Sequence, residues 1–194
     1  MLPRNIETAR GRRLQDIVQA SSEENLFSWP DLNDDDYARI GKLIVTFSYI
    51  DFNIRRIVDD HDDAGLLCEP WKGRSKKLRM FEAEEALKSI LHENETHRVA
   101  LFRITELRGL RNLVAHFAIK RFPDDDAFLF LGKSASDYRQ IFGGEPDPAL
   151  MLTAVLESST ITNALKELRG LQNWIATASS QIATQLHAAK LIKR

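Results

Sequence analysis

The stretch LRGLRNLVAHF, residues 107–117, ends an apolar helical pattern with three polar side chains that are suited to acid–base chemistry. Arg111 carries a permanent charge on a planar fork, which matches the oxygens of a phosphate or carboxylate. Histidine is the side chain type that can serve as an acid or a base near neutral pH, which makes His116 a candidate for proton transfer, and Asn112 is an uncharged hydrogen-bonding group. These residue types predict a site that stabilises negative charge and transfers protons.

The spacing of these residues leaves two interpretations open. On a regular helix Arg111 and His116 lie about 140° apart, so they meet if the last turn unwinds or if a second copy contributes. A purely structural role is the alternative, since cations favour helix C-termini and arginine can bond the last carbonyls. The same Arg–His spacing recurs at Arg56 and His61, without the asparagine. With the asparagine required, the pattern is expected by chance roughly 0.02 times.

The motif RNLVAH, at the end of a long helix, resembles the HEPN superfamily, whose signature is Arg, a polar residue and a following His. The resemblance implies a metal-independent endoribonuclease, without a cofactor, of the kind found in toxin–antitoxin and other defence systems. It implies RNA as the substrate and cleavage by attack of the ribose 2′-OH. Arg111 would stabilise the phosphate charge, His116 would transfer protons and Asn112 would position them.

The resemblance also implies partners. HEPN ribonucleases generally form homodimers that pool two motifs in one cleft, and an antitoxin or nucleotidyltransferase is the expected protein partner. One residue departs from the pattern of some HEPN toxins, which carry Tyr where this chain has Ala118. The alternative function is therefore a catalytically inactive HEPN-like module that binds nucleotide, RNA or a protein partner.

Two further sets of residues are candidates for supporting roles. Asp51 falls on the apolar face of an earlier helix, where it either completes the site or pairs with Arg55 or Arg111. The segment 72–79 follows Trp71 and carries five cations, which either bind RNA phosphates or form a solvated loop; they are Lys72, Arg74, Lys76, Lys77 and Arg79.

The remaining histidines and the cysteine predict no site. His92 and His97 are five residues apart, so a helix would not direct them at one metal ion, and we expect both at the surface. Cys68 has no second cysteine or adjacent histidine to activate it.

Apolar periodicity predicts a mainly α protein. Three- and four-residue spacing indicates helices near residues 33–60, 75–93, 95–116 and 158–194, the first capped by Asn33 and the last by Ser159 or Thr160; residues 6–22 form a weaker helix. A hairpin is expected around Pro123–Asp126, with a third strand in 149–158. The predicted fold is an up-and-down, HEPN-like bundle of four to five helices. Residues 1–32 form an arm, and 33–194 form the bundle with a β insertion near 117–156.

Composition places the chain among ordinary globular proteins of one domain. Its 194 residues are 43% hydrophobic and 28% charged, and the net charge of −1 gives no overall basic field for nucleic acid. A single cysteine suits a reducing compartment. The N-terminus lacks a signal-peptide pattern and no apolar run has the length of a membrane span, so we expect a cytoplasmic protein without membrane contact.

Overall fold

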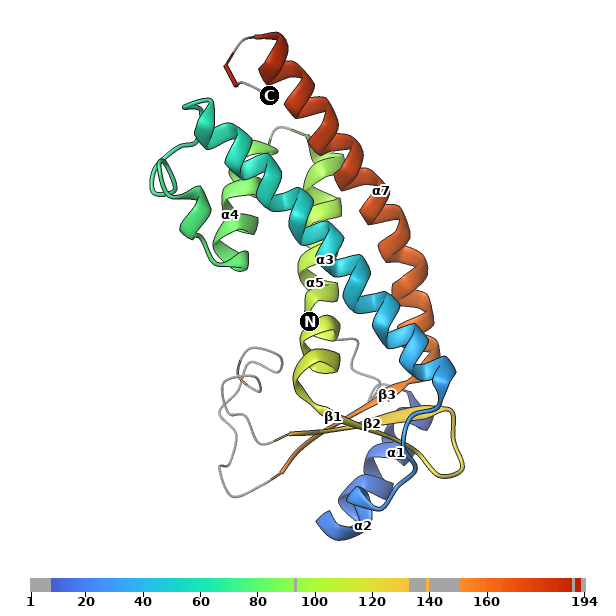
Figure 1. The fold of residues 1–194 in the computed structure, drawn as a ribbon. Helices are drawn as coiled ribbons and strands as arrows, with labels where there is room; N and C mark the ends of the chain where they lie inside the picture. Colours follow the sequence, from blue (N-terminus) through green and yellow to red (C-terminus); the bar gives the residue numbers. More distant parts are fainter. Residues whose placement is uncertain (1–7, 93, 133–138, 140–150, 190, 193–194) are drawn as a thin grey trace. The chain divides into compact units, whose positions relative to one another are not determined.

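The computed structural model describes residues 8–92, 94–132, 139, 151–189 and 191–192. In these residues the chain is mainly helical and contains one small antiparallel sheet of three strands (Figure 1). The prediction of a mainly α fold with a small β insertion is therefore confirmed. Residues 133–138 and 140–150 of the predicted insertion lie outside the described residues.

The chain divides into two compact units. The first comprises residues 1–44 and 106–166, and the second comprises residues 45–105 and 167–194. Three long helices contribute to both units: α3 (Asp34–Asp63), α5 (Glu95–His116) and α7 (Ser158–Ala188). The boundary expected after residue 32 falls inside the first unit, and the division into arm and bundle stays a prediction.

The sheet belongs to the first unit. Its strands are β1 (Ala118–Arg121), β2 (Ala127–Gly132) and β3 (Leu152–Glu157), with β2 in the middle. Both pairings are antiparallel, with Ala118 opposite Leu131 and Leu131 opposite Thr153. The expected hairpin and third strand are therefore confirmed.

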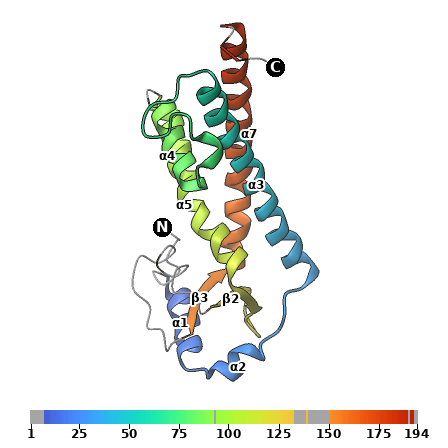
Figure 2. The same cartoon turned by 60° about the vertical axis from the view of Figure 1, so that its left-hand side comes forward.

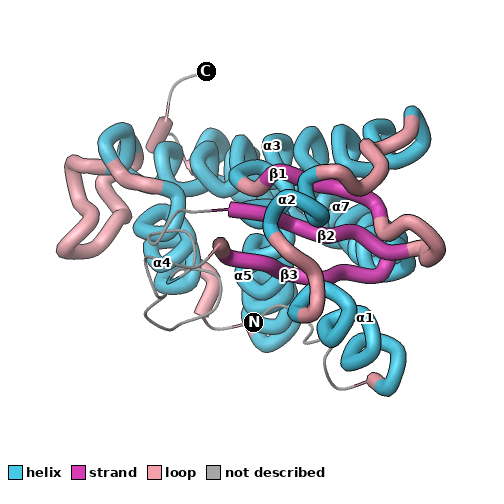
Figure 3. Tube along the Cα trace, turned by 90° about the horizontal axis from the view of Figure 1, so that it is seen from below, coloured by secondary structure: helices cyan, strands magenta, loops and turns pink. Residues whose placement is uncertain are grey.

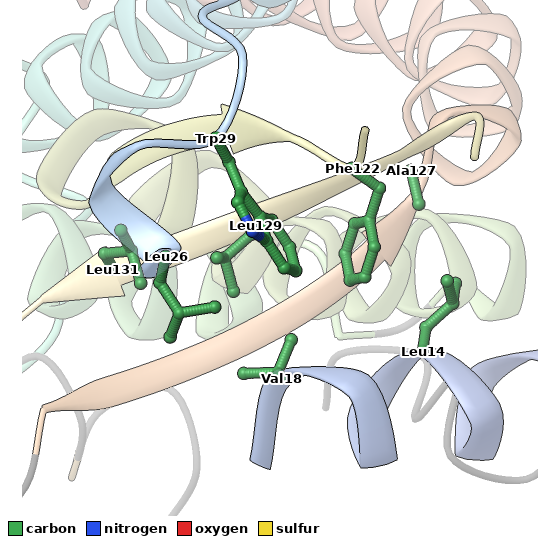
Figure 4. Close-up of a cluster of buried hydrophobic side chains, with 8 residues drawn as sticks. All are labelled: Leu14, Val18, Leu26, Trp29, Phe122, Ala127, Leu129 and Leu131. Carbon is green, nitrogen blue, oxygen red and sulfur yellow. The ribbon is translucent and has the colours of Figure 1, made fainter. Parts of the chain in front are cut away.

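The central strand β2 is buried on both faces, which explains its unbroken apolar run AFLFL. Side chains alternate along a strand, so Phe128 and Phe130 lie on one face and Leu129 and Leu131 on the other. Leu129 and Leu131 pack in one cluster with residues of helices α1 (Ala9–Gln19) and α2 (Glu23–Phe27) (Figures 3 and 4). Helix α1 confirms the weak N-terminal prediction, whereas α2 was not predicted.

An aromatic pair closes this cluster. The rings of Trp29 and Phe122 lie with their centroids 4.7 Å apart and tilted by 55°, above Leu14 and Val18 of α1 (Figure 4). Two arginines of α1 bind the hairpin turn as well: Arg10 and Arg13 both form ion pairs with Asp125. The N-terminal helices thus cover one face of the sheet and hold its turn.

The second unit is built from helices (Figure 2). It contains α4 (Met80–Ile90), the short 3-10 turn η2 (Ser75–Lys77) and its segments of α3, α5 and α7. Its core side chains repeat at the three- and four-residue spacing that the sequence predicted; among them are Phe47, Ile50, Ile54, Ile57, Leu87, Leu168 and Ile175. Arg103 of α5 forms a bidentate ion pair with Glu167 of α7, at 2.6 and 2.8 Å.

Two helix boundaries differ from the prediction. Helix α4 begins at Met80 rather than near residue 75, because Leu78 adopts an extended conformation after the 3-10 turn. Helix α7 begins at Ser158, so neither Ser159 nor Thr160 is its cap. Strand β3 ends at Glu157 and leads directly into the helix, where the Ser158 amide donates to the carbonyl oxygen of Asp126 at 3.1 Å.

Candidate functional site

Helix α5 carries all three residues of the candidate motif at its C-terminal end, in the first unit. Leu110, Leu113 and Val114 are buried and fix the inner face of this turn. Arg111 and Asn112 are half-buried, and His116 is exposed as the last residue of the helix. The motif therefore lies at the boundary between the core and solvent, where its polar groups remain accessible.

The structure joins two of the three side chains directly. The Nη1 atom of Arg111 donates a hydrogen bond to Oδ1 of Asn112 at 3.2 Å. Asn112 and His116 are four residues apart, so they are neighbours on one face of the helix. The side chain of Arg111 starts from a different face of the helix. The hydrogen bond to Asn112 nevertheless brings its guanidinium toward the face that Asn112 and His116 share.

One of the two expected routes for bringing Arg111 and His116 together is wrong. Helix α5 is α-helical through His116, and the Phe117 amide donates to the Leu113 carbonyl at 3.2 Å, so the last turn does not unwind. Contribution from a second copy, the other route, stays a prediction.

A close contact anchors the end of α5 to the sheet. Phe117, directly after His116, is 6% exposed, and its ring lies over Gly132 at the end of β2. A Cβ atom built on Gly132 would lie 2.7 Å from both Cδ1 and Cε1 of Phe117. The absence of a side chain at residue 132 thus leaves room for the Phe117 ring, which packs on β2 directly after the helix ends at His116.

A buried ionic group in the first unit was missed by the sequence analysis. Asp36 is fully buried and accepts hydrogen bonds from Arg39 at 3.1 Å and from Arg121 at 2.6 Å. Its hydrogen bond to Arg121 raises the pKa of that guanidinium above its usual value. Arg121 also binds Asp126 at 3.2 Å. For this end of α3 the sequence analysis predicted a cap at Asn33.

That capping prediction is itself confirmed. The Oδ1 atom of Asn33 accepts from the Asp36 amide at 2.9 Å, and Asp36 Oδ2 accepts from the Asn33 amide at 3.2 Å. Asp36 therefore has two functions, since one carboxylate both caps the start of α3 and pairs with Arg39 of the same helix and with Arg121 of β1.

Asp51 lies on α3 in the second unit and is half-buried. The motif residues belong to the first unit, so the supporting role of Asp51 stays a prediction. Arg55 is one of its two expected partners. The Arg55 guanidinium donates a hydrogen bond to the Leu78 carbonyl oxygen at 3.1 Å, which ties α3 to the segment before α4.

The basic segment, residues 72–79, exposes all five of its cations. Its backbone is held by Asp62, whose two carboxylate oxygens accept from the amides of Gly73 at 2.6 Å and Ser75 at 3.1 Å. Burial alone would raise the pKa of Asp62, but these hydrogen bonds outweigh it and hold the pKa below its usual value. Gly73 has a φ of +70°, which favours glycine in this turn.

Acidic side chains accompany part of this basic surface. Lys76 lies 4.0 Å from Asp63, and Arg79 lies 3.5 Å from Glu82 while stacking over the Phe81 ring at 4.6 Å. These exposed pairs are weak. The segment therefore presents cations from an ordered backbone, as a phosphate-binding surface requires.

Comparison of the chain with protein-family models, with curated proteins and with solved structures gave no match. The HEPN resemblance thus stays a prediction that is based on its motif and helix order. In the described residues, none of the helices combines the length and apolar character needed to cross a membrane.

Proposed function

We propose that this chain is a metal-independent endoribonuclease of the HEPN type, belonging to a toxin or other defence system, with its site at the end of α5. The observation that supports it best is the hydrogen bond between Arg111 and Asn112, on a helix end where His116 is exposed. A structural arginine would bond the last helix carbonyls, whereas this guanidinium binds a neighbouring side chain.

The proposed reaction is transesterification of RNA. A histidine removes the proton of a ribose 2′-OH, and that oxygen attacks the adjacent phosphorus. The bond to the 5′ oxygen breaks, this oxygen takes up a proton, and a 2′,3′-cyclic phosphate remains. Arg111 stabilises the charge that develops on the phosphate oxygens, and Asn112 keeps the guanidinium in place through the 3.2 Å contact.

A homodimer supplies what one copy lacks in this scheme. Arg111 and His116 lie about 140° apart on the unbroken helix α5, so a second copy can bring its His116 to the phosphate that Arg111 of the first copy binds. Exposed apolar side chains on α3 support self-association: Val45, Tyr49 and Phe52 are 69%, 45% and 61% exposed at spacings of four and three. A face of this kind is typical of an interface. Phe52→Lys is expected to convert a dimer to a monomer in light scattering.

The decisive test is cleavage of RNA in EDTA. Wild-type protein is expected to leave 2′,3′-cyclic phosphate ends, and Arg111→Ala and His116→Ala are each expected to abolish cleavage. His92→Ala and Arg169→Ala serve as matched controls because both residues are exposed and outside the motif. Equal activity in wild type and in both motif variants would refute the site assignment.

Mixing the two inactive variants tests the composite site. If each site takes Arg111 from one copy and His116 from the other, a mixed dimer contains one intact site. Random exchange then restores about a quarter of wild-type activity. If active dimers form but mixing restores nothing, both residues act from the same copy.

The basic segment supports RNA as the ligand. Replacing Lys72, Arg74 and Lys77 with Ala is expected to weaken RNA binding and to reduce its dependence on salt, since fewer counterions are released. An antitoxin or nucleotidyltransferase is the proposed protein partner, and a reducing cytoplasm is the proposed setting for the exposed Cys68.

The second candidate function is a HEPN-like module that binds RNA, nucleotide or a protein partner without cleavage. The observation that favours it is Ala118, which begins β1 where some HEPN toxins have Tyr. RNA that is bound but remains uncut under the conditions above would support this function and contradict the ribonuclease.

A further inference from the structure

Two histidines from different helices line one pocket in the second unit. His61 lies near the end of α3 and His97 lies in the first turns of α5, and the pocket between them has a volume of about 280 Å³. The sequence analysis placed His97 at the surface, but the residue is half-buried. Neither ring belongs to the proposed ribonuclease site.

The tautomer of His97 is set by a tryptophan. The indole Nε1–H of Trp174 donates to Nδ1 of His97 at 3.1 Å, and the two rings lie 5.5 Å apart by their centroids. Indole nitrogen only donates, so Nδ1 must carry a lone pair and the proton of the neutral ring lies on Nε2. His97 therefore offers a hydrogen-bond donor at its remaining nitrogen.

The tautomer of His61 is the opposite one. Its Nδ1 lies 2.9 Å from the carbonyl oxygen of Ile57, one helical turn earlier. A carbonyl oxygen only accepts, so Nδ1 carries the proton and Nε2 of the neutral ring carries the lone pair. One pocket thus contains an acceptor at Nε2 of His61 and a donor at Nε2 of His97.

The other walls of the pocket are uncharged. Gln181 and Gln185 of α7 line it with carboxamides, each of which both donates and accepts, and Ile90 and Ile182 add apolar surface. Charged side chains are missing among the described residues that line it. Such a lining disfavours a phosphate or a carboxylate and suits a neutral, flat ligand with polar edges.

We propose that this pocket binds a planar ring that carries an N–H group beside a C=O group, the lactam edge found in uracil and guanine. The ring N–H donates to Nε2 of His61, and the carbonyl oxygen accepts from Nε2–H of His97. The two carboxamides bind the remaining polar edge, and the isoleucines cover the ring faces. This proposal does not depend on the ribonuclease, because it concerns binding of a free base or nucleoside.

The test is a titration of the full chain, labelled with ¹⁵N, with uridine while the imidazole nitrogens are followed by NMR. Before ligand is added, His61 and His97 are expected to show opposite tautomers. Uridine is expected to shift both rings in a saturable manner and to leave the exposed His92 and His187 unchanged. Guanosine, which shares the lactam, shows whether the pocket also admits a purine.

The matched control ligand is 3-methyluridine, which keeps the ring and carbonyls but lacks the N–H. Its binding is expected to be at least about tenfold weaker, because a polar site rejects an analogue that leaves one of its groups unpaired. Binding of uridine and 3-methyluridine with equal affinity would overturn the proposal, as would the absence of any shift at His61 and His97.

Trp174→Phe separates the tautomer from the shape of the pocket. This variant keeps an aromatic ring but removes the N–H that fixes His97, so uridine affinity is expected to fall several-fold. Trp71→Phe, outside the pocket lining, is the control and is expected to bind as wild type does. Unchanged affinity in folded Trp174→Phe would show that the tautomer does not determine binding.

Discussion

Gly132→Ala tests the close contact between β2 and Phe117, the residue that directly follows α5. An added Cβ would lie 2.7 Å from two ring carbons of Phe117, whereas carbon atoms in favourable contact lie roughly 3.5–4.0 Å apart. The overlap is about 1 Å and involves a ring that is 6% exposed, so the ring cannot swing into solvent. Overpacking of this kind costs about 1–3 kcal/mol of unfolding free energy.

The melting temperature is the measured quantity. For a chain of this length 1 kcal/mol corresponds to about 2–4 °C, so Gly132→Ala is expected to lower Tm by about 2–12 °C. Gly41→Ala is the matched control, because α3 leaves nothing within 4 Å of a Cβ at residue 41. That helical substitution is expected to raise stability by about 0.5–1 kcal/mol.

A double-mutant cycle assigns the loss to the ring. Phe117→Leu removes the ring atoms that Gly132→Ala would meet, so the alanine is expected to cost less in the leucine background. A Tm for Gly132→Ala at or above that of wild type would refute the reasoning. Equal costs in both backgrounds would show that the loss does not come from Phe117.

The remaining predictions concern three carboxylates, those of Asp36, Asp125 and Asp62. Asp36→Asn is expected to cost about 1.5–3 kcal/mol, because it removes the buried carboxylate that accepts hydrogen bonds from two arginines, which are themselves partly exposed. Asp35→Asn, on the exposed side of the same turn, is expected to cost little, and urea unfolding measures both losses. The hydrogen bond from Arg10 lowers the pKa of Asp125, so its stabilisation is complete above the unfolded pKa of about 3.9 and is lost as pH falls through the lower folded pKa. Asp125→Asn is therefore expected to reduce the acid dependence of stability below about pH 4. Asp62→Asn removes the charge that accepts two amides and is expected to speed hydrogen exchange at Gly73 and Ser75.

Predictions based on local patterns were confirmed where buried residues recur at a regular spacing along the chain. The core face of α3, its Asn33 cap and the hairpin around the Asp-rich turn all follow from residue spacing and turn chemistry. The errors were the missed helix α2, the surface position expected for His97, and the boundaries of two helices. Residues 75–79 have helical composition, but Asp62, which lies earlier in the chain, binds their backbone and delays α4 until Met80.

The candidate site was predictable only in part. Arg111 and Asn112 are neighbours in sequence, so their contact lies within the reach of adjacent side chains, and the position of His116 follows from the helix. By contrast, nothing near Gly132 indicated the ring of Phe117, and His97 gave no sign of a partner 77 residues away at Trp174.

The sequence by itself determined the helical periodicity, the Asn33 cap, the short strands and the placement of a cation, an amide and an imidazole within one helix end. These features depend on interactions between residues a few positions apart, which backbone geometry fixes. Only the tertiary structure decided that Asp36 would neutralise Arg121, 85 residues away, and that two histidines would line one pocket with opposite tautomers. Such contacts arise when packing of the whole chain buries polar groups together, because each must then find a partner that local spacing does not specify.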